Sequence, residues 1–431
     1  MLGSGRRAAV IGIATCILAA LACSGVFGAS PVRITFWHIY SGKSADAETM
    51  SELLRVFNEQ HKGRIQAEPV EISFWDFDAK YLAAIAAGTP PNVVIWDITS
   101  TAGRAAKGGL VPLDSYMKRS NLSKRDFWAS ALERETYRGE TYSLPFSADV
   151  RVLFYNVDHF KEAGLDPAKP LVTWDDLVTY ARKLTIQEGG RLARVGFAPM
   201  WGNVWFLPYV WGNDGRWFAE DGAPTINHPK NVEALEWVMS FNKSYGLQAL
   251  TNFGAQFGPG LQDPFISGRV SMIIQVNPFM IEIERYRPAL NWNIALIPYR
   301  TNPKAGWAAG FCLEMPKKRS NAHYDEAWEL ISFLLSEASQ ETWVKNTRSL
   351  GARPAVAQRA FPGDRRWQVV VNQMELSRFQ DYVVEAPSWW FSTWSELDNA
   401  FAGRKTPKQA LDEAQRAVER DIHLYVGTTG R

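Results

Sequence analysis

The stretch 141–156 (TYSLPFSADVRVLFYN) most constrains how this chain can fold. Its first half is extended and polar, and contains Pro145, which cannot donate to a sheet ladder and so favours a strand end or edge. Its second half, 150–155, is a run of branched and aromatic residues that predicts a buried β-strand. This change of character favours a chain crossing between two domains, because hinges lie at element ends and absorb backbone rotation. A hairpin within one domain is the alternative.

The first third of the chain alternates strand and helix patterns. The run at 93–96 is fully apolar, which is typical of a strand in a parallel sheet buried on both faces. Later in the chain, 174–184 has helical spacing with Thr173 as its N-cap, and 270–276 predicts a further strand. The alternation predicts a doubly wound α/β fold. Its predicted strands are 32–37, 65–72 and 93–96, and its predicted helices are 45–61, 78–87 and 102–109.

An export segment is predicted at the N-terminus. Arg6 and Arg7 precede an almost uncharged apolar run at 8–21, as in a secretory signal. Removal of 1–28 would leave about 400 residues, enough for two domains. The alternative cleavage site is a lipoprotein box that ends at Cys23, and acylation of Cys23 would anchor the protein to a membrane. A retained membrane helix is the remaining alternative.

Charge and cysteine content argue against several classes of protein. The 47 Lys and Arg residues nearly balance the 45 Asp and Glu residues, so no nucleic-acid or other polyanionic partner is expected. Only Cys312 lies outside the export segment, so no disulfide framework is expected. The six histidines have no metal-ligand spacing. We expect no cofactor and no catalytic residue, although Asp97, Asp149 and Asp214 leave a glycosidase pair as an alternative.

Aromatic and polar side chains recur where the predicted strands end. Ligands of open α/β sheets bind beyond the carboxyl ends of the strands. A sugar has apolar C–H faces and many hydroxyls, so it needs flat rings to stack on and carboxylates or amides to pair with. The loops and the crossover therefore predict a carbohydrate site. Its candidate residues are Trp37, Tyr40, Ser41, Trp75, Asp76, Trp96, Asp97 and Asp149.

Six segments together resemble the extracellular solute-binding proteins of sugar ABC importers, the family that contains maltose-binding protein. They occur in consistent order, at 34–42, 82–97, 105–114, 142–156, 265–279 and 402–415. The resemblance implies a two-lobed periplasmic-binding-protein fold, in which each lobe is a doubly wound sheet with flanking helices and a multi-segment hinge joins the two. The expected N-terminal lobe is 29–147 plus 277–318, and the expected C-terminal lobe is 148–276 plus 319–431.

The resemblance also implies site residues, position by position. Trp390, ahead of the terminal helix, is expected to stack on the sugar and to be exposed in the open form. Trp307 and Arg353 are further candidates, since an arginine can clamp a phosphate or a carboxylate. The other matched positions are Asp149, Trp201, Asn203, Trp205, Asn277, Phe279 and Trp389.

In function, the resemblance implies the extracytoplasmic substrate-binding subunit of an ABC transporter. Such a subunit captures a carbohydrate between its lobes, closes by hinge motion and delivers the sugar to membrane permease subunits. We expect a monomer in the periplasm or at the cell surface. The alternatives are a binding protein for a glycerophosphodiester or a peptide, and a carbohydrate-active hydrolase.

Overall fold

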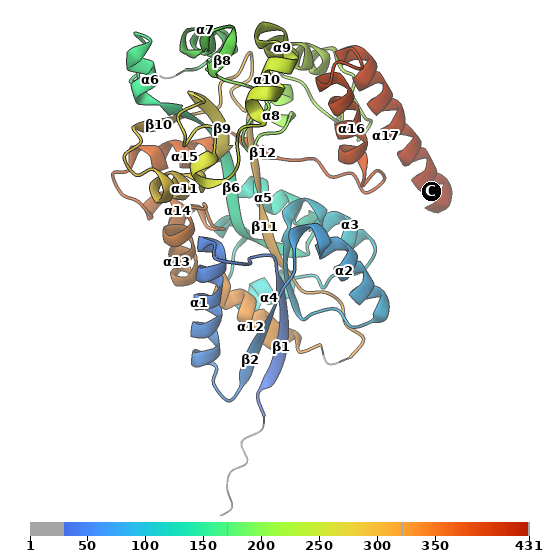
Figure 1. The fold of residues 1–431 in the computed structure, drawn as a ribbon. Coiled ribbons are helices and arrows are strands. Elements are labelled where there is room, and N and C mark those ends of the chain that lie inside the picture. The colour runs from blue at the N-terminus through green and yellow to red at the C-terminus, as the bar shows by residue number, and fades with distance from the viewer. Residues whose placement is uncertain (1–29, 170, 321, 430–431) are drawn as a thin grey trace, which may run out of the picture.

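The computed structural model describes residues 30–169, 171–320 and 322–429. The ribbon has two lobes that are joined through long central strands (Figure 1). The predicted export segment 1–28, with Cys23, lies outside the described residues. Within the described ranges no helix is long and apolar enough to cross a membrane. The same ranges contain no group of His, Cys, Asp and Glu side chains that could hold a metal ion.

The first lobe is built on parallel strands, as the sequence predicts. β1 (Val32–His38) pairs with β2 (Ile65–Glu71) on one side and with β3 (Val93–Asp97) on the other. Asn58 closes the outer edge of β2 at Ala67, because its amide accepts from the Ala67 nitrogen at 2.8 Å and donates to the Ala67 oxygen at 3.1 Å. Such a block prevents further strand pairing at that point.

Seven helices and a short β-hairpin belong to this lobe, and most of the helices lie beside the sheet in the lower part of Figure 1. They include the three helices predicted at 45–61, 78–87 and 102–109, which correspond to α1, α2 and α3. The helices are α1 (Ala45–Gln60), α2 (Phe74–Ala87), α3 (Thr101–Ala106), α4 (Asp114–Arg119), α5 (Ala129–Arg134), α12 (Tyr324–Leu334) and α13 (Glu337–Thr347), and the hairpin is β4 (Thr136–Tyr137) with β5 (Glu140–Thr141).

Two antiparallel strands, β6 (Ser143–Asn156) and β11 (Gly306–Glu314), run through both lobes. Their first-lobe ends pair with each other, and β11 also pairs there with β3. The stretch 141–156 therefore carries the chain between lobes, as the sequence predicts. At the crossing a Cβ on Gly310 would lie 2.2 Å from the Ser147 oxygen, so these strands can approach only with a glycine at that position.

In the second lobe the other half of β6 pairs with two antiparallel strands, β9 (Met272–Val276) and β10 (Trp292–Ala295). The start of β11 pairs with β12 (Ser377–Phe379). α7 begins with Thr173 as its N-cap, in a capping box with Asp176. The remaining elements are α6 (Val157–Glu162), α7 (Trp174–Leu184), β7 (Ile186–Glu188), β8 (Arg191–Arg194), α8 (Leu207–Gly212), α9 (Pro229–Tyr245), α10 (Leu247–Gly254), α11 (Phe279–Tyr286), α14 (Pro354–Arg359), α15 (Arg365–Glu375), α16 (Trp389–Phe401) and α17 (Pro407–Thr429).

The hydrophobic packing differs from the predicted lobe boundaries. α11 follows residue 277, yet its Phe279 contacts Phe154 and Phe265, which lie in the second lobe. α13 follows residue 318, yet its Trp343 packs in the first-lobe cluster with Phe36. A resemblance orders the crossings but does not fix which sheet face a following helix covers. From this packing we propose a first lobe of 30–149 plus 310–350, and a second lobe of 150–309 plus 351–429.

Candidate functional site

Four tryptophans meet beside the crossing strands, on the second-lobe side. The Trp205 ring lies 5.0 Å from that of Trp390 at an interplanar angle of 13°, and 4.9 Å from that of Trp307. Trp394 completes this tryptophan cluster, 5.9 Å from Trp205. Trp390 is only 6% exposed and Trp307 is buried, whereas Trp205 is 37% exposed. Trp205 therefore keeps part of its ring surface open to solvent while it contacts three other rings.

Arg151, which the sequence analysis did not single out, holds this cluster to the crossover. It lies on β6 with its guanidinium 3.6 Å from the centre of the Trp307 ring. It donates to the Asp149 carboxylate at 2.6 Å, and to the backbone oxygen and the side-chain oxygen of Asn203 at 3.1 and 2.7 Å. Arg151 therefore fixes the loop that carries Trp205, and it brings Asp149, Asn203 and Trp307 of the predicted site together.

Three carboxylates belong to the polar side of the same region. Burial raises the pKa of Asp97, which ends β3 and accepts from Thr99. The pKa of Asp46, in the first turn of α1, is raised to about 6, first by burial and then by the Asp149 carboxylate. Burial lowers the pKa of Arg151, and the carboxylates of Asp149 and Asp97 oppose that shift. The Asp149 carboxylate is therefore close enough to act on both Asp46 and Arg151, and Asp97 acts on Arg151 and on the Arg104 guanidinium.

The loop after β2 carries the most exposed aromatic ring of the predicted set. Trp75, in the first turn of α2, is 87% exposed and contacts Phe74 edge to face at 5.2 Å. Asp76 beside it is exposed and pairs with Lys80 at 3.7 Å. Ser41, in the loop after β1, is also exposed. These three side chains are accessible, as a ligand contact requires.

The other aromatic residues of the first-lobe loops pack inside the lobe. Trp96 is 3% exposed and stacks on Phe77 of α2 at 4.1 Å, with an interplanar angle of 7°. Trp37 is half-buried against the same Phe77 and Tyr81. Tyr40 is buried 4.9 Å from Trp343. The prediction placed these rings in the site because they end strands, but successive strand side chains point to opposite faces, and their faces are covered by helices.

Four predicted residues of the second lobe are also placed in the interior or away from the tryptophan cluster. Asn277 is fully buried, accepts from the Val150 nitrogen at 2.8 Å and donates to the Arg348 oxygen, so it ties hinge segments together. Phe279 packs edge to face on Phe154. The remaining two are Trp389, which is buried and donates to the Asp381 backbone oxygen at 3.1 Å, and Trp201, which stacks on Phe253.

Arg353 also differs from the expected anion clamp. Its guanidinium lies 3.8 Å from Glu337 and 4.0 Å from Asp126, both outside the tryptophan cluster. Two carboxylates thus already compete for its charge. This position is better explained as a structural pairing between α13, η2 (Lys124–Asp126) and the N-cap of α14.

Sequence reasoning missed Arg151, Asp46, Trp394 and Tyr382. Arg151 and Asp149 are two residues apart on β6, so their side chains lie on the same face of the strand. The strand period alone could therefore have indicated Arg151 as a site residue. Tyr382 follows β12, and nothing in the local pattern distinguishes it from an ordinary loop residue. Its role depends on contacts with the other lobe, which are described below.

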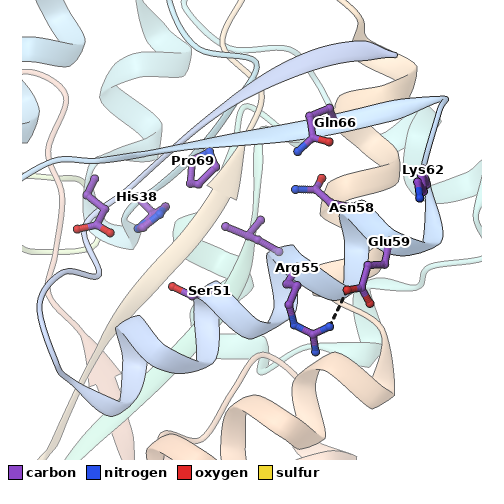
Figure 2. Close-up of a pocket in the computed structure, with 10 residues that line it drawn as sticks. His38, Ser51, Arg55, Asn58, Glu59, Lys62, Gln66 and Pro69 are labelled. Carbon is purple, nitrogen blue, oxygen red and sulfur yellow. Dashed lines mark hydrogen bonds and ion pairs between the residues drawn. The ribbon is translucent and has the colours of Figure 1, made fainter. Parts of the chain in front are cut away.

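A separate cavity of about 570 Å³ lies between α1 and β2. Figure 2 shows His38 and Pro69 toward one part of it, and Gln66 and Lys62 toward another. Burial lowers the pKa of His38 to about 4, so this histidine is neutral at ordinary pH. Arg55 pairs with Glu59 at 2.8 Å. No lining residue belongs to the tryptophan cluster, so this cavity is distinct from the candidate site.

The fold and the residues at its crossover define a two-lobed solute-binding protein. The model of the bacterial extracellular solute-binding protein family matches residues 41–341. The chain therefore belongs to the bacterial extracellular solute-binding proteins, the substrate-binding components of ABC transporters. Its location outside the cytoplasm follows from that family.

Similar proteins with assigned ligands fall into two groups. The sn-glycerol-3-phosphate-binding periplasmic protein UgpB of Pectobacterium atrosepticum is 26% identical, over 93% of this chain and 93% of that protein. UgpB of Escherichia coli is 23% identical, over 91% and 92%. Among solved structures, CpMnBP1 with mannotriose bound has a TM-score of 0.79 and 26% identity, and covers 90% of this chain and 100% of that one. Maltose-bound MalE3 of T. maritima shares the fold, with a TM-score of 0.73, 20% identity, and coverage of 90% and 99%.

Proposed function

We propose that this chain captures a neutral oligosaccharide between its lobes, and that Trp205 is the ring on which the sugar stacks. The exposed Trp205 ring, backed by Trp390 and Trp307, carries this proposal. A flat ring that is already held in place loses little conformational entropy when a sugar face covers it. Asn203, Asp149 and Asp97 would supply acceptors for hydroxyl groups. The oligosaccharide-bound structural neighbour CpMnBP1 supports the same class of ligand.

A phosphorylated solute is the second candidate, because UgpB is similar over almost the whole chain. The charges at the site favour the neutral sugar instead. Arg151 is engaged by Asp149 and Asn203, and Arg353 is engaged by Asp126 and Glu337. A phosphate brought near Asp149, Asp97 and Asp46 would meet like charge, which is costly in a partly desolvated cleft.

A thermal-shift screen tests both candidates. A ligand that binds only the native state at a hundredfold excess over its Kd stabilises the protein by about 2.7 kcal/mol. We expect manno- and gluco-oligosaccharides to raise the melting temperature and sn-glycerol 3-phosphate to leave it unchanged. Stabilisation by the phosphate alone would reverse the assignment. Incubation of the stabilising oligosaccharide with the protein should return it uncleaved, whereas release of shorter sugars would favour the hydrolase alternative.

We further propose that the loaded protein is an exported monomer that delivers its sugar to permease subunits. The basic and apolar start of the sequence supports removal of 1–28, or processing at Cys23 with acylation. Mass spectrometry of the protein from its native host distinguishes these: an acylated Cys23 indicates anchoring, and a free N-terminus near residue 29 indicates release. An intact N-terminal Met would contradict export.

A further inference from the structure

One contact between the lobes lies outside the crossing strands and depends on a glycine. Gly103 is in α3 of the first lobe, and Tyr382 is in the segment between β12 and α16 of the second. A Cβ built on Gly103 would lie 2.0 Å from the Tyr382 hydroxyl and 2.8 Å from the ring carbon that bears it. The hydroxyl therefore rests on the helix backbone, in space that any side chain at position 103 would occupy.

A second contact joins the lobes beside the first. Asp381, the neighbour of Tyr382, pairs with Arg134 of α5 at 3.4 Å. Both residues line a cavity of about 430 Å³, formed by α5 on one side and by β12 and the loop 214–218 on the other. Two successive residues of one second-lobe segment thus touch two first-lobe helices. We name the Tyr382–Gly103 and Asp381–Arg134 contacts together the interlobe seam.

The first-lobe side of the seam is held firmly. Arg104, next to Gly103, is buried and pairs with Glu314 of β11 at 2.9 Å. Its guanidinium also donates to Ser100 at 2.6 Å. Thr101, at the start of α3, donates to the buried carboxyl of Glu135 at 3.0 Å. Moving α3 away from Tyr382 would break a buried ion pair, which is strongly destabilising.

The second-lobe side is held as well. The Asp381 backbone oxygen accepts from the indole nitrogen of Trp389 at 3.1 Å, and Trp389 is buried against Phe218 and Trp217. Ala386 donates to the Val383 oxygen at 3.1 Å and closes a turn. The backbone is held on both sides, so an atom added at residue 103 has to displace the Tyr382 side chain or move one lobe against the other.

We propose that Tyr382 and Gly103 are positioning residues for closure: they meet when the lobes close, and they set how closely the walls of the sugar cleft can approach. This proposal rests on the proposed function, because the cleft whose closed width the contact sets is the proposed sugar-binding cleft. Burial raises the pKa of Tyr382, which keeps its hydroxyl neutral where it meets the helix backbone. Residue 103 must then be glycine for tight binding, even though it contacts no ligand.

The variant Gly103→Ala tests this directly. Alanine favours a helix interior by about 1 kcal/mol over glycine, so the lobe itself should fold at least as well. With the saccharide that stabilises wild type, calorimetry should show affinity about tenfold weaker or worse, and small-angle scattering should show a smaller decrease in radius of gyration. The matched control is Gly109→Ala, where a Cβ meets only the Arg104 oxygen, at 3.4 Å; its affinity should equal that of wild type.

A rescue separates the seam from a defect in α3. The double variant Gly103→Ala/Tyr382→Ala removes the clashing ring, so it should bind as tightly as Tyr382→Ala alone. Wild-type affinity in Gly103→Ala, or a loss that Tyr382→Ala does not rescue, would overturn the proposal. If wild type bound no saccharide, the proposed function would fail instead. The seam would then be tested with whichever screened solute stabilises wild type: the decrease in radius of gyration on binding should be smaller in Gly103→Ala than in wild type, and equal decreases would refute it.

Discussion

Two tryptophans of the predicted site, one on each lobe, are packed in opposite ways. On the first lobe Trp75 projects from the start of α2 and is 87% exposed, and among the described residues its ring neighbour is Phe74. On the second lobe Trp205 stands on Trp390 and Trp307 and shows one surface. A supported ring is already ordered, whereas a free ring loses rotamer entropy when a ligand fixes it. We therefore propose Trp205, and not the more exposed Trp75, as the main stacking ring.

The largest expected effect is on the ring that supports Trp205. Trp390→Ala should lower the free energy of unfolding by about 3–5 kcal/mol, because it opens a cavity within a buried cluster. Thermal or urea unfolding without ligand measures this. The matched control is Trp75→Ala, which should stay within about 0.5 kcal/mol of wild type. Equal stability of Trp390→Ala and wild type would show that Trp390 is not a core ring.

The Asp46 carboxyl of the candidate site should make the stability of the protein depend on pH. Asp46 has a folded-state pKa of about 6 against a usual value of 3.8, so the folded protein holds this proton more tightly than the unfolded chain. Its contribution to stability is complete below pH 3.8 and is lost as the pH rises to about 6. The loss is at most about 3 kcal/mol. Asp46→Asn should therefore be more stable than wild type at pH 7.5 and similar at pH 4. A constant difference in melting temperature between these pH values would contradict the burial of Asp46.

Trp205→Ala should act mainly on ligand affinity. Covering one ring face would contribute about 1.5–3 kcal/mol if burial is nearly complete, so calorimetry should show sugar binding weakened about 10- to 100-fold. Trp201→Ala is the comparison within the same loop, because Trp201 stacks on Phe253 instead of joining the tryptophan cluster. If Trp201→Ala weakened binding more than Trp205→Ala, the stacking surface would be at the other end of the loop.

The smallest effect is expected from Trp75→Ala. An unsupported ring should change oligosaccharide affinity by less than about threefold, below 1 kcal/mol. Titration with a disaccharide and with a tetrasaccharide checks this. A loss of affinity that grows with the length of the sugar would show that Trp75 contacts the outer units of longer sugars. Trp75 and Trp205 would then both be stacking rings.

The periodic elements of this chain were predictable because their signals are local. The helix expected at 45–61 is α1, and the apolar run at 93–96 is β3, with its parallel neighbour β1. Thr173 was predicted to cap a helix and forms the capping box of α7. The crossover at 141–156 was also visible, because its composition changes along one extended strand.

The site was only partly predictable, and the reason is geometric. Asp149, Asn203, Trp205 and Trp307 were predicted, and Arg151 joins them in the structure. Trp390 was also predicted, but as an exposed ring, and the structure buries it behind Trp205. Trp96 and Trp389 have the same chemistry but different neighbours, and no local pattern states which neighbour covers a ring. Their ligand roles would need solvent access that the packing removes.

The family, the order of strands and helices and the crossover could be predicted without a structure, since each depends on short-range periodicity or on an ordered set of motifs. The folded structure was needed to tell which tryptophans are buried and which reach solvent, and to bring Gly103 against Tyr382. Those properties arise from pairs such as Gly103 and Tyr382, which lie far apart in the chain and meet only when both lobes are folded. Side-chain burial is a property of such long-range contacts, so it is fixed by packing and not by local sequence.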